Sequence, residues 1–398
     1  MIVKVLVVLA LLIGLPLLGV VLEGHPIGPY LAFPPQTLSI EHAPFSWPMF
    51  VGLTLLIVLT VAPVVLRVAR SRVAEHETAT LLRAFPWWGW MGAALTGCSW
   101  ILAWSRFSWF SAFQPHTFTP LWLGYVLTVN GFTFRRTGHC LMVDRPGFFL
   151  ALFPLSAAFW WSFEYLNRFV QNWHYIGGDA FTPWEYFLYA TIPFSTVLPA
   201  VWSTMELLAS IRSMKAGVHG LPPLRWVTQA WVGWALLLAA SAGLTGIGIW
   251  PDRLFPLVWV APLLLITAVQ ILAGEETVFS RLSQGDGTSL WLAAVAAIVC
   301  GICWELWNYK SLAHWEYAIP SVHRFKLFEM PLLGYAGYLP FGLECLAVTQ
   351  LVFPGQFREL MTLWSQRGLR SPGQGTSFRS KRADNRPGKR RSEQGRVL

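Results

Sequence analysis

Long apolar runs alternate with short polar connections over most of this chain. Several runs reach or approach the roughly 20 residues that an α-helix needs to cross a bilayer. The pattern predicts an all-α integral membrane protein with about ten transmembrane helices. We expect these helices at residues 4–22, 48–66, 87–104, 117–133, 148–168, 185–210, 227–249, 254–273, 289–308 and 329–353.

The first apolar run, "KVLVVLALLIGLPLLGVVL", begins with a lysine, as a signal peptide would. A signal peptide also needs a small-x-small cleavage site, and none precedes Glu23. We therefore favour a retained membrane anchor over a cleaved signal peptide. Either interpretation leaves the later spans unchanged.

A polar pattern at the ends of two apolar runs is repeated. The segments "FEYLNRFVQNWHY" and "WELWNYKSLAHWEY" both read aromatic-Glu-x-x-Asn followed by Trp-x-Tyr, at an offset of 141 to 142 residues. Such internal similarity indicates a duplicated unit. The matched pairs are Glu164 with Glu305, Asn167 with Asn308, Trp173 with Trp315, and Tyr175 with Tyr317.

The similarity continues downstream when small gaps are allowed. Leu198-Pro199 matches Leu339-Pro340, and two further acidic pairs are Glu185 with Glu329 and Glu206 with Glu344. Each copy would hold four helices, so both copies would insert in the same orientation about an axis along the membrane normal. The predicted organisation is two N-terminal helices with a basic loop (1–86), a first copy (87–211), a second copy (227–353) and a basic tail (355–398).

Composition and charge agree with a membrane protein and orient it. Hydrophobic residues make up 55% of the chain and charged residues only 12%, about half the charge of a typical soluble chain. Arginine and lysine gather in alternate loops and in the tail, which are expected to be cytoplasmic. We expect both termini on the cytoplasmic side of the cell (inner) membrane.

The C-terminal tail carries most of the net charge. From residue 355 it holds eleven Lys/Arg against three acidic residues, a net +8, whereas the whole chain is +9. Its Gly, Ser and Pro content predicts disorder. We interpret it mainly as a topology determinant, with contact to anionic lipids as an alternative; nucleic-acid binding is not favoured.

The repeated acids are the main candidates for chemistry. Glu at i and Asn at i+3 share a helical face, so each copy can present a carboxyl and an amide to the same space. Charged groups inside a membrane are costly, usually face the bundle interior and mark functional paths. Burial favours the neutral, proton-donating form. The alternative is structural, with Glu and Asn bonding across helices or capping the loop that carries Trp-x-Tyr.

We assign Glu164, Glu305, Asn167 and Asn308 as candidate catalytic residues. The repeated aromatic positions, the outer acidic pair (Glu185 and Glu329) and the inner acidic pair (Glu206 and Glu344) are candidate substrate-binding residues, although anchoring in the membrane's aromatic belt is an alternative for the aromatics. These are Trp173, Tyr175, Trp315, Tyr317, Glu185, Glu329, Glu206 and Glu344.

Other motifs give little support to a cofactor. Cys300 and Cys303 form a C-x-x-C inside an apolar helix, where small buried residues are the better interpretation. The sequence "EHE" at 75–77 lies in a basic loop and is interpreted as a solvated helix surface. No phosphate-loop, zinc-hydrolase, nucleophile-elbow or dinucleotide pattern is present. We expect no metal and no cofactor.

The second copy's "HWEYAIP" and "FEMPLLGYAGYLPFGLECLAV" resemble the repeated domain of membrane lycopene cyclases of the small bacterial and fungal type. Trp315 and Tyr317 fit the Trp-x-Tyr-like part of that pattern. The Pro-x-Glu-Glu part of that pattern fits less well. Here the proline, Pro340, is four residues before the acid, Glu344, and a second acid is missing. The resemblance covers about 30 residues in each copy. It implies acid chemistry on a polyene or isoprenoid.

These features favour a membrane enzyme that acts on an isoprenoid-like or other lipid through carboxyl acid/base chemistry. A proton-coupled or lipid transporter with titrating glutamates is an alternative, because parallel repeats and proline-interrupted helices also suit carriers. A non-catalytic membrane scaffold is the third. The expected partners are the lipid bilayer and a hydrophobic lipid substrate.

Overall fold

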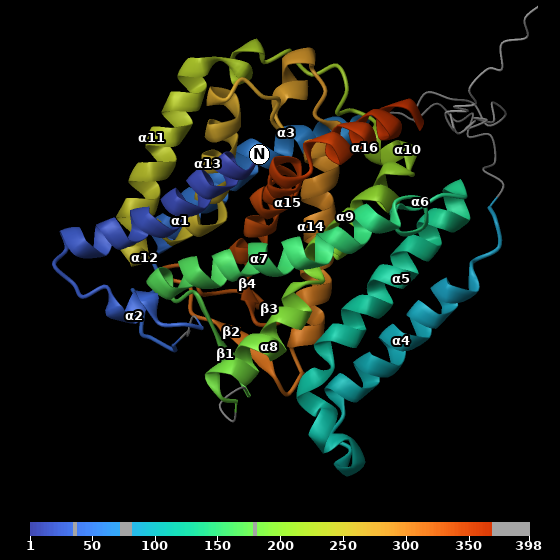
Figure 1. The fold of residues 1–398 in the computed structure, drawn as a ribbon, viewed down its shortest axis with the longest axis horizontal. Coiled ribbons are helices and arrows are strands. Elements are labelled where there is room, and N and C mark those ends of the chain that lie inside the picture. The colour runs from blue at the N-terminus through green and yellow to red at the C-terminus, as the bar shows by residue number, and fades with distance from the viewer. Residues whose placement is uncertain (35–37, 72–81, 178–180, 368–398) are drawn as a thin grey trace, which may run out of the picture.

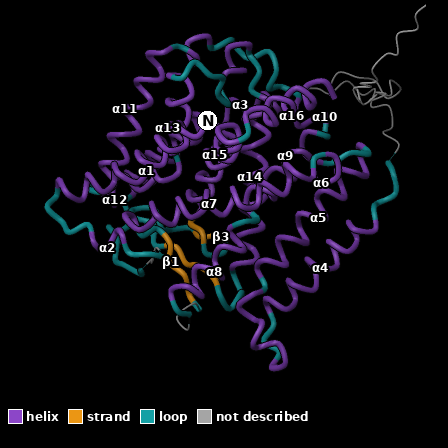
Figure 2. The backbone as a smooth tube through the Cα atoms, in the orientation of Figure 1, coloured by secondary structure: helices purple, strands orange, loops and turns teal. Residues whose placement is uncertain are grey.

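Helices form nearly all of the regular structure (Figures 1 and 2). The computed structural model describes residues 1–34, 38–71, 82–177 and 181–367. Within these ranges the strands are limited to two short antiparallel pairs, β1 (Trp173–Ile176) with β2 (His314–Tyr317) and β3 (Lys326–Leu327) with β4 (Met330–Pro331).

Each of the ten predicted apolar runs is mainly helical, although the run predicted at 185–210 is broken into two helices and the run predicted at 329–353 begins with β4. The corresponding helices are α1 (Ile2–Leu22), α3 (Trp47–Arg70), α4 (Trp87–Trp104), α5 (Phe118–Thr137), α7 (Pro146–Val170), α8 (Pro183–Phe194) with α9 (Val197–Ala209), α11 (Ala230–Ile247), α13 (Ala261–Leu272), α14 (Thr288–Asn308) and α15 (Tyr338–Val352). Shorter elements connect them: α2 (Gly28–Leu31), η1 (Ser108–His116), α6 (Leu141–Asp144), α10 (Arg212–Lys215), η2 (Arg225–Thr228), α12 (Pro251–Leu254), η3 (Phe255–Trp259), η4 (Ser280–Gln284) and η5 (Leu332–Gly337).

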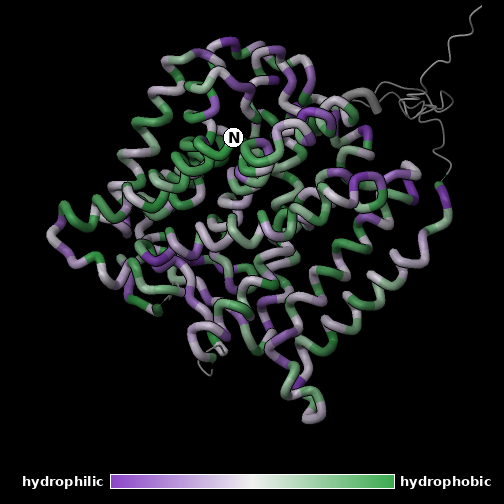
Figure 3. Tube along the Cα trace, viewed as in Figure 1, coloured by the Kyte–Doolittle hydropathy of each residue, from purple (hydrophilic) through white to green (hydrophobic). Residues whose placement is uncertain are grey.

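Fewer helices meet a strict test for membrane crossing than the ten predicted. In the part of the chain that the structure describes, seven helices are long and apolar enough to span a bilayer, and α4 and α5 are not among them. An eighth span results if the pair Pro251–Trp259 and Ala261–Leu272, bent by 55°, is counted as one. In Figure 3 the apolar colour runs along α1 in particular. The structure therefore fits a multi-pass membrane protein, with a count of ten spans unconfirmed.

The connections predicted to be basic and cytoplasmic lie at one end of the helices. Arg67 at the end of α3 donates to the carbonyl of Gly217 at 2.6 Å. Arg145 pairs with Glu359 at 2.5 Å, and Lys4 near the N-terminus contacts Glu275. Contacts between residues that are far apart in sequence thus bring the alternate loops and the N-terminus together at one end of the helices.

The remaining connections meet at the opposite end. His42 binds Asp252 at 2.6 Å, and Arg106 donates to the carbonyl of Lys310 at 2.8 Å. The β1–β2 pair joins the ends of α7 and α14 at this same level. The two sets of loops therefore lie at opposite ends of the helices, and which end faces the cytoplasm stays a prediction.

Helix packing follows the same order in the two similar segments. In the first, α4 packs on α5, α5 on α9 and α9 on α7; in the second, α11 packs on α13, α13 on α15 and α15 on α14. Between segments, α9 packs on α14.

Small residues permit the close approach of α4 and α5. A Cβ on Gly92 of α4 would lie within 3.0 Å of backbone atoms of Thr128 and Gly124 on α5.

The start of the C-terminal tail differs from its predicted disorder. Residues Pro354–Arg367 form helix α16, because Phe357, Leu360, Met361 and Trp364 recur at helical spacing and are buried. The prediction of disorder from residue 355 is therefore wrong as far as 367. Residues 368–398, with most of the basic charge, lie outside the described residues, as does the "EHE" at 75–77.

Candidate functional site

The two Trp-x-Tyr segments pair with each other. β1 and β2 run antiparallel, with Trp173 opposite Tyr317 and Tyr175 opposite Trp315. Each Trp therefore faces the Tyr of the other segment, as a local two-fold axis through the pair would require. Because residues i and i+2 of a strand lie on one face, all four aromatic side chains lie on the same face of this ribbon.

The two repeated asparagines fix the backbone of these strands. Asn167 donates to the carbonyl of Trp173 at 2.8 Å and accepts from the amide of Asn172 at 2.7 Å. Asn308 donates to the carbonyl of Trp315 at 2.7 Å and accepts from its amide at 2.8 Å. These amides contact the strands and not the glutamates, which corresponds to the structural alternative of capping the Trp-x-Tyr loop.

Replacing Asn308 by Ala is expected to destabilise the protein by about 2 kcal/mol or more. The change leaves the amide and carbonyl of Trp315 without their partner, and an unsatisfied buried polar group costs about 1–3 kcal/mol. Thermal unfolding in detergent micelles measures the effect. Asn308→Asp, which keeps the acceptor and loses the donor, should be intermediate. Equal midpoints for the wild type and Asn308→Ala would contradict the role of this amide.

Glu164 lies completely buried near the end of α7 and accepts several hydrogen bonds on one oxygen. Its Oε1 accepts from the Tyr175 hydroxyl at 2.6 Å, from Trp160 Nε1 at 3.0 Å and from Trp173 Nε1 at 3.2 Å. Two of these donors come from the Trp-x-Tyr segment. The backbone position that Asn167 fixes therefore decides what the carboxyl of Glu164 contacts.

Glu305 on α14 has an equivalent environment. It is completely buried, and its Oε1 accepts from the hydroxyls of Tyr317 at 2.7 Å and Tyr338 at 2.8 Å. Trp315 Nε1 donates to the Tyr317 hydroxyl at 2.8 Å. In both copies a tyrosine from the strand donates to the glutamate of the same copy.

The second oxygen of each carboxyl is different. Oε2 of Glu164 and Oε2 of Glu305 are buried and have no hydrogen-bond partner among the described residues. All the donors thus converge on Oε1, whereas Oε2 has no partner among the described residues. A neutral carboxyl can hold its proton on either oxygen, and only Oε1 contacts the tyrosines.

A small aromatic cavity of about 110 Å³ lies beside the two carboxyls. The hydroxyl-bearing residues Tyr175, Tyr317 and Tyr338 line it, whereas Glu164 and Glu305 do not. Each glutamate therefore contacts the cavity through a tyrosine that both touches the carboxyl and faces the space. The ring walls include Trp160, Trp173, Trp259, Trp304, Trp315 and Phe118.

A larger apolar cavity of about 690 Å³ adjoins the first. Its walls come from α3, α14, η5 and the start of α15, and include Ile57, Trp291 and Leu343. Trp173, Trp259 and Tyr317 line both cavities and so form their common wall. The size is in the usual range for small-molecule sites, about 300–1,000 Å³.

The inner acidic pair lies apart from this cluster. Glu206 on α9 accepts from the amide of Leu141 at 2.7 Å, at the start of α6. Glu344 on α15 accepts from the amide of Leu263 at 3.2 Å, in the first turn of α13. Both carboxyls thus bind amides at helix N-termini, where acceptors and negative charge are favourable.

The outer acidic pair also has local partners. Glu185 forms a capping box with Thr182 at the start of α8 and is exposed. Glu329 lies in the turn between β3 and β4 and pairs with Lys326 at 3.5 Å. Neither residue lines the two cavities. The structure thus brings together Glu164, Glu305 and the four Trp-x-Tyr residues, and places the other four acids elsewhere.

Sequence reasoning missed Tyr338, Trp160 and Trp304. Tyr338 binds Glu305 directly, yet the alignment of Leu198-Pro199 with Leu339-Pro340 puts Val197 opposite it. Comparison of the two copies therefore could not identify Tyr338. Trp160 lies one helical turn before Glu164, and this i, i+4 spacing was the available signal.

The described residues contain no disulfide and no group of three or more metal-ligating side chains. Cys300 is buried, with its sulfur 3.4 Å from the Thr204 hydroxyl. Comparison of the chain with protein-family models, with curated proteins and with solved structures finds no match.

Proposed function

We propose that this protein is a membrane enzyme that acts on a hydrophobic, isoprenoid-like lipid by acid/base chemistry, with Glu164 and Glu305 as its proton donor and acceptor. One observation carries the proposal: two buried glutamates each bind a tyrosine that lines a single aromatic cavity. Intramembrane acids placed in this way usually serve function.

The two halves are proposed to derive from a duplicated four-helix unit. The equal packing order of the helices and the two-fold pairing of Trp173 with Tyr317 and Tyr175 with Trp315 support this origin. The end that carries the basic loops is proposed to face the cytoplasm, with both termini, by the positive-inside rule. The cavity then lies toward the outer leaflet.

Proton transfer in this geometry passes through the tyrosines. A neutral glutamate whose proton lies on Oε1 reverses its hydrogen bond with the tyrosine and donates to the tyrosine oxygen. It can then give that proton to the tyrosine while the tyrosine gives its own proton to a carbon–carbon double bond of the substrate. The substrate becomes a carbocation. The second glutamate, ionised, then takes a proton from the neighbouring carbon through its own tyrosine, and a rearranged double bond forms. One proton enters and one leaves, so no redox cofactor is needed.

The aromatic walls suit such an intermediate. Faces of Trp and Tyr rings attract a cation within about 6 Å of their centre, and Trp160, Trp304 and Trp315 line the cavity from different elements. The adjoining apolar cavity offers space for the hydrocarbon chain. Asn167 and Asn308 are proposed as positioning residues for the strands, and not as proton carriers.

The test compares membrane lipids, without preselecting species, from cells that express the wild type or Glu164→Gln/Glu305→Gln. Gln keeps the size of the side chain and removes the titratable proton. A lipid that accumulates with the wild type and is absent with the double variant supports the enzyme. Glu185→Gln, at an exposed acid outside the cluster, is the control and should retain the product.

A carrier is the second candidate. The 55° bend between Pro251–Trp259 and Ala261–Leu272, and the break between α8 and α9 after Pro193, resemble the discontinuous helices of transporters. Unchanged lipid profiles, with equal amounts of folded protein, would contradict the enzyme. They would move the interpretation to transport, or to a scaffold without catalysis.

A further inference from the structure

A third cavity, which is polar, lies at the opposite end of the molecule, among the basic loops. Its volume is about 500 Å³, and it is lined by the basic side chains Arg212, Lys215, His219 and Arg281 together with Asp286. Met361 and Trp364 of α16 form an apolar wall. Nothing in the proposed lipid chemistry uses this space.

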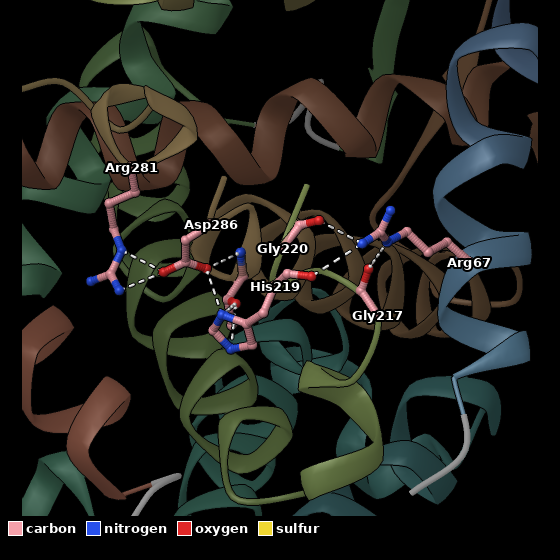
Figure 4. A network of polar contacts seen from close by, with 7 residues as sticks. Arg67, Gly217, His219, Gly220, Arg281 and Asp286 are labelled. Atoms are coloured by element: carbon pink, nitrogen blue, oxygen red, sulfur yellow. Dashed lines mark hydrogen bonds and ion pairs between the residues drawn. The ribbon is translucent and has the colours of Figure 1, made fainter. Parts of the chain in front are cut away.

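One side of this cavity is a closed polar network (Figure 4). Asp286 pairs with Arg281 at 2.5 Å and with His219 at 3.2 Å, and accepts from the amide of Thr288 at 3.0 Å. Although burial raises the pKa of Asp286, the hydrogen bonds from Thr288 and the Arg281 charge outweigh it and lower that pKa. The Asp286 charge is thus matched within the wall.

Arg67 holds the loop that carries His219 in place. Its guanidinium donates to the carbonyls of Gly217 at 2.6 Å and Gly220 at 2.8 Å (Figure 4). Gly217 has a φ of +84°, a conformation that glycine adopts at little cost. The loop is therefore a fixed part of the cavity.

Arg212 and Lys215 are the cations left without a counter-charge. No described residue forms an ion pair or hydrogen bond with either side chain, and both lie on the single short helix α10. Burial and the Arg212 charge lower the pKa of Lys215. Like charges at i and i+3 repel, so this pair gains stability from an anion in the cavity.

The neighbouring groups suit a phosphate in particular. Ser289 and Thr288 line the cavity, and they begin the 21-residue helix α14. The Thr288 amide already donates to Asp286, so this helix N-terminus favours an anion through its dipole and the amides that follow Thr288. Arginine and lysine bind phosphate oxygens by charge-assisted hydrogen bonds. Trp364 and Met361 can contact the apolar part of a phosphate ester.

We propose that this cavity binds the phosphate group of an anionic ligand between Arg212, Lys215 and the first turn of α14. The phosphate belongs to a phospholipid headgroup of the adjacent leaflet or to a free phosphate compound. The site is independent of the glutamate cluster, since the two lie at opposite ends of the helices.

The experiment uses the full chain in uncharged dodecyl maltoside micelles and follows its thermal unfolding midpoint. One series titrates inorganic phosphate, and the other adds phosphatidylglycerol, with phosphatidylcholine as the zwitterionic comparison. A ligand that binds the folded state raises the midpoint, and the rise grows with the logarithm of the ligand concentration above its Kd. Arg212→Gln/Lys215→Gln should weaken the apparent affinity at least about tenfold, because charge-assisted contacts are lost.

The matched control is Arg70→Gln/Arg225→Gln, which removes the same charge from exposed positions outside the cavity. A rise with phosphate that only the cavity variant loses supports a free phosphate ligand, and the same result with phosphatidylglycerol alone supports a headgroup. No rise with either, or equal losses in both double variants, overturns the proposal. If the cavity variant does not fold, Lys215→Gln alone should still show a reduced affinity.

Discussion

Tyr317→Phe is expected to lower formation of the lipid product by about 100- to 10,000-fold, the range that general acid/base groups contribute. The Tyr317 hydroxyl donates to Glu305 Oε1 at 2.7 Å and accepts from Trp315 Nε1 at 2.8 Å. It also lines both cavities. Phenylalanine keeps the ring and removes only the oxygen through which the proton would pass.

The measurement is the amount of product per folded protein in membranes that contain each variant. Tyr335→Phe is the control. The Tyr335 hydroxyl donates to the carbonyl of Leu327, and Tyr335 lines neither cavity. It should retain product formation near the wild-type level. Wild-type product formation by Tyr317→Phe would exclude this tyrosine from proton transfer and leave its role as ring packing.

Gly342→Ala is expected to destabilise the protein by about 3 kcal/mol or more, at the upper end of overpacking effects. A Cβ at Gly342 would lie 2.2 Å from the carbonyl oxygen of Ala293 and 2.7 Å from its carbonyl carbon. Backbone atoms cannot move aside as a flexible side chain can. The helices α14 and α15 would separate, and they carry Glu305 and Tyr338.

Thermal unfolding in micelles tests this packing, with Gly97→Ala as the control. Gly97 lies inside α4, and no neighbouring atom lies within 4 Å of the position that a Cβ would take there. Alanine at this position should stabilise the helix by up to about 1 kcal/mol. Both variants replace glycine by alanine, yet their effects on the free energy of unfolding should have opposite signs. Similar midpoints for both variants would show that α14 and α15 are less closely packed than the structure has them.

Hydropathy alone located the helices, because burial in lipid or protein requires the same long apolar runs. The end of the chain was harder. Residues 354–367 lie beside charged, glycine-rich sequence, and composition averaged over the tail concealed the four buried apolar positions of α16. Membrane crossing by α4 and α5 remains a prediction, since their apolarity falls below that of the other long helices.

The candidate site was foreseeable in part. The repeat identified Glu164 and Glu305, but spacing at i and i+3 gives only a shared direction. It could not show that Asn167 turns to the strand backbone while Glu164 binds Tyr175. Glu206 and Glu344 illustrate the opposite problem, because a similar position in two copies does not reveal that each binds an amide from a separate helix.

The wall shared by the two cavities has a consequence for selectivity. Trp173, Trp259 and Tyr317 line both cavities, so a linear hydrocarbon that extends from the larger cavity into the smaller one would pass these three side chains. It therefore presents its tip, and not an internal segment, to the reacting groups. The enzyme we propose would therefore react at a fixed distance from the end of the hydrocarbon chain. Substrates of different lengths would all be modified in their terminal unit.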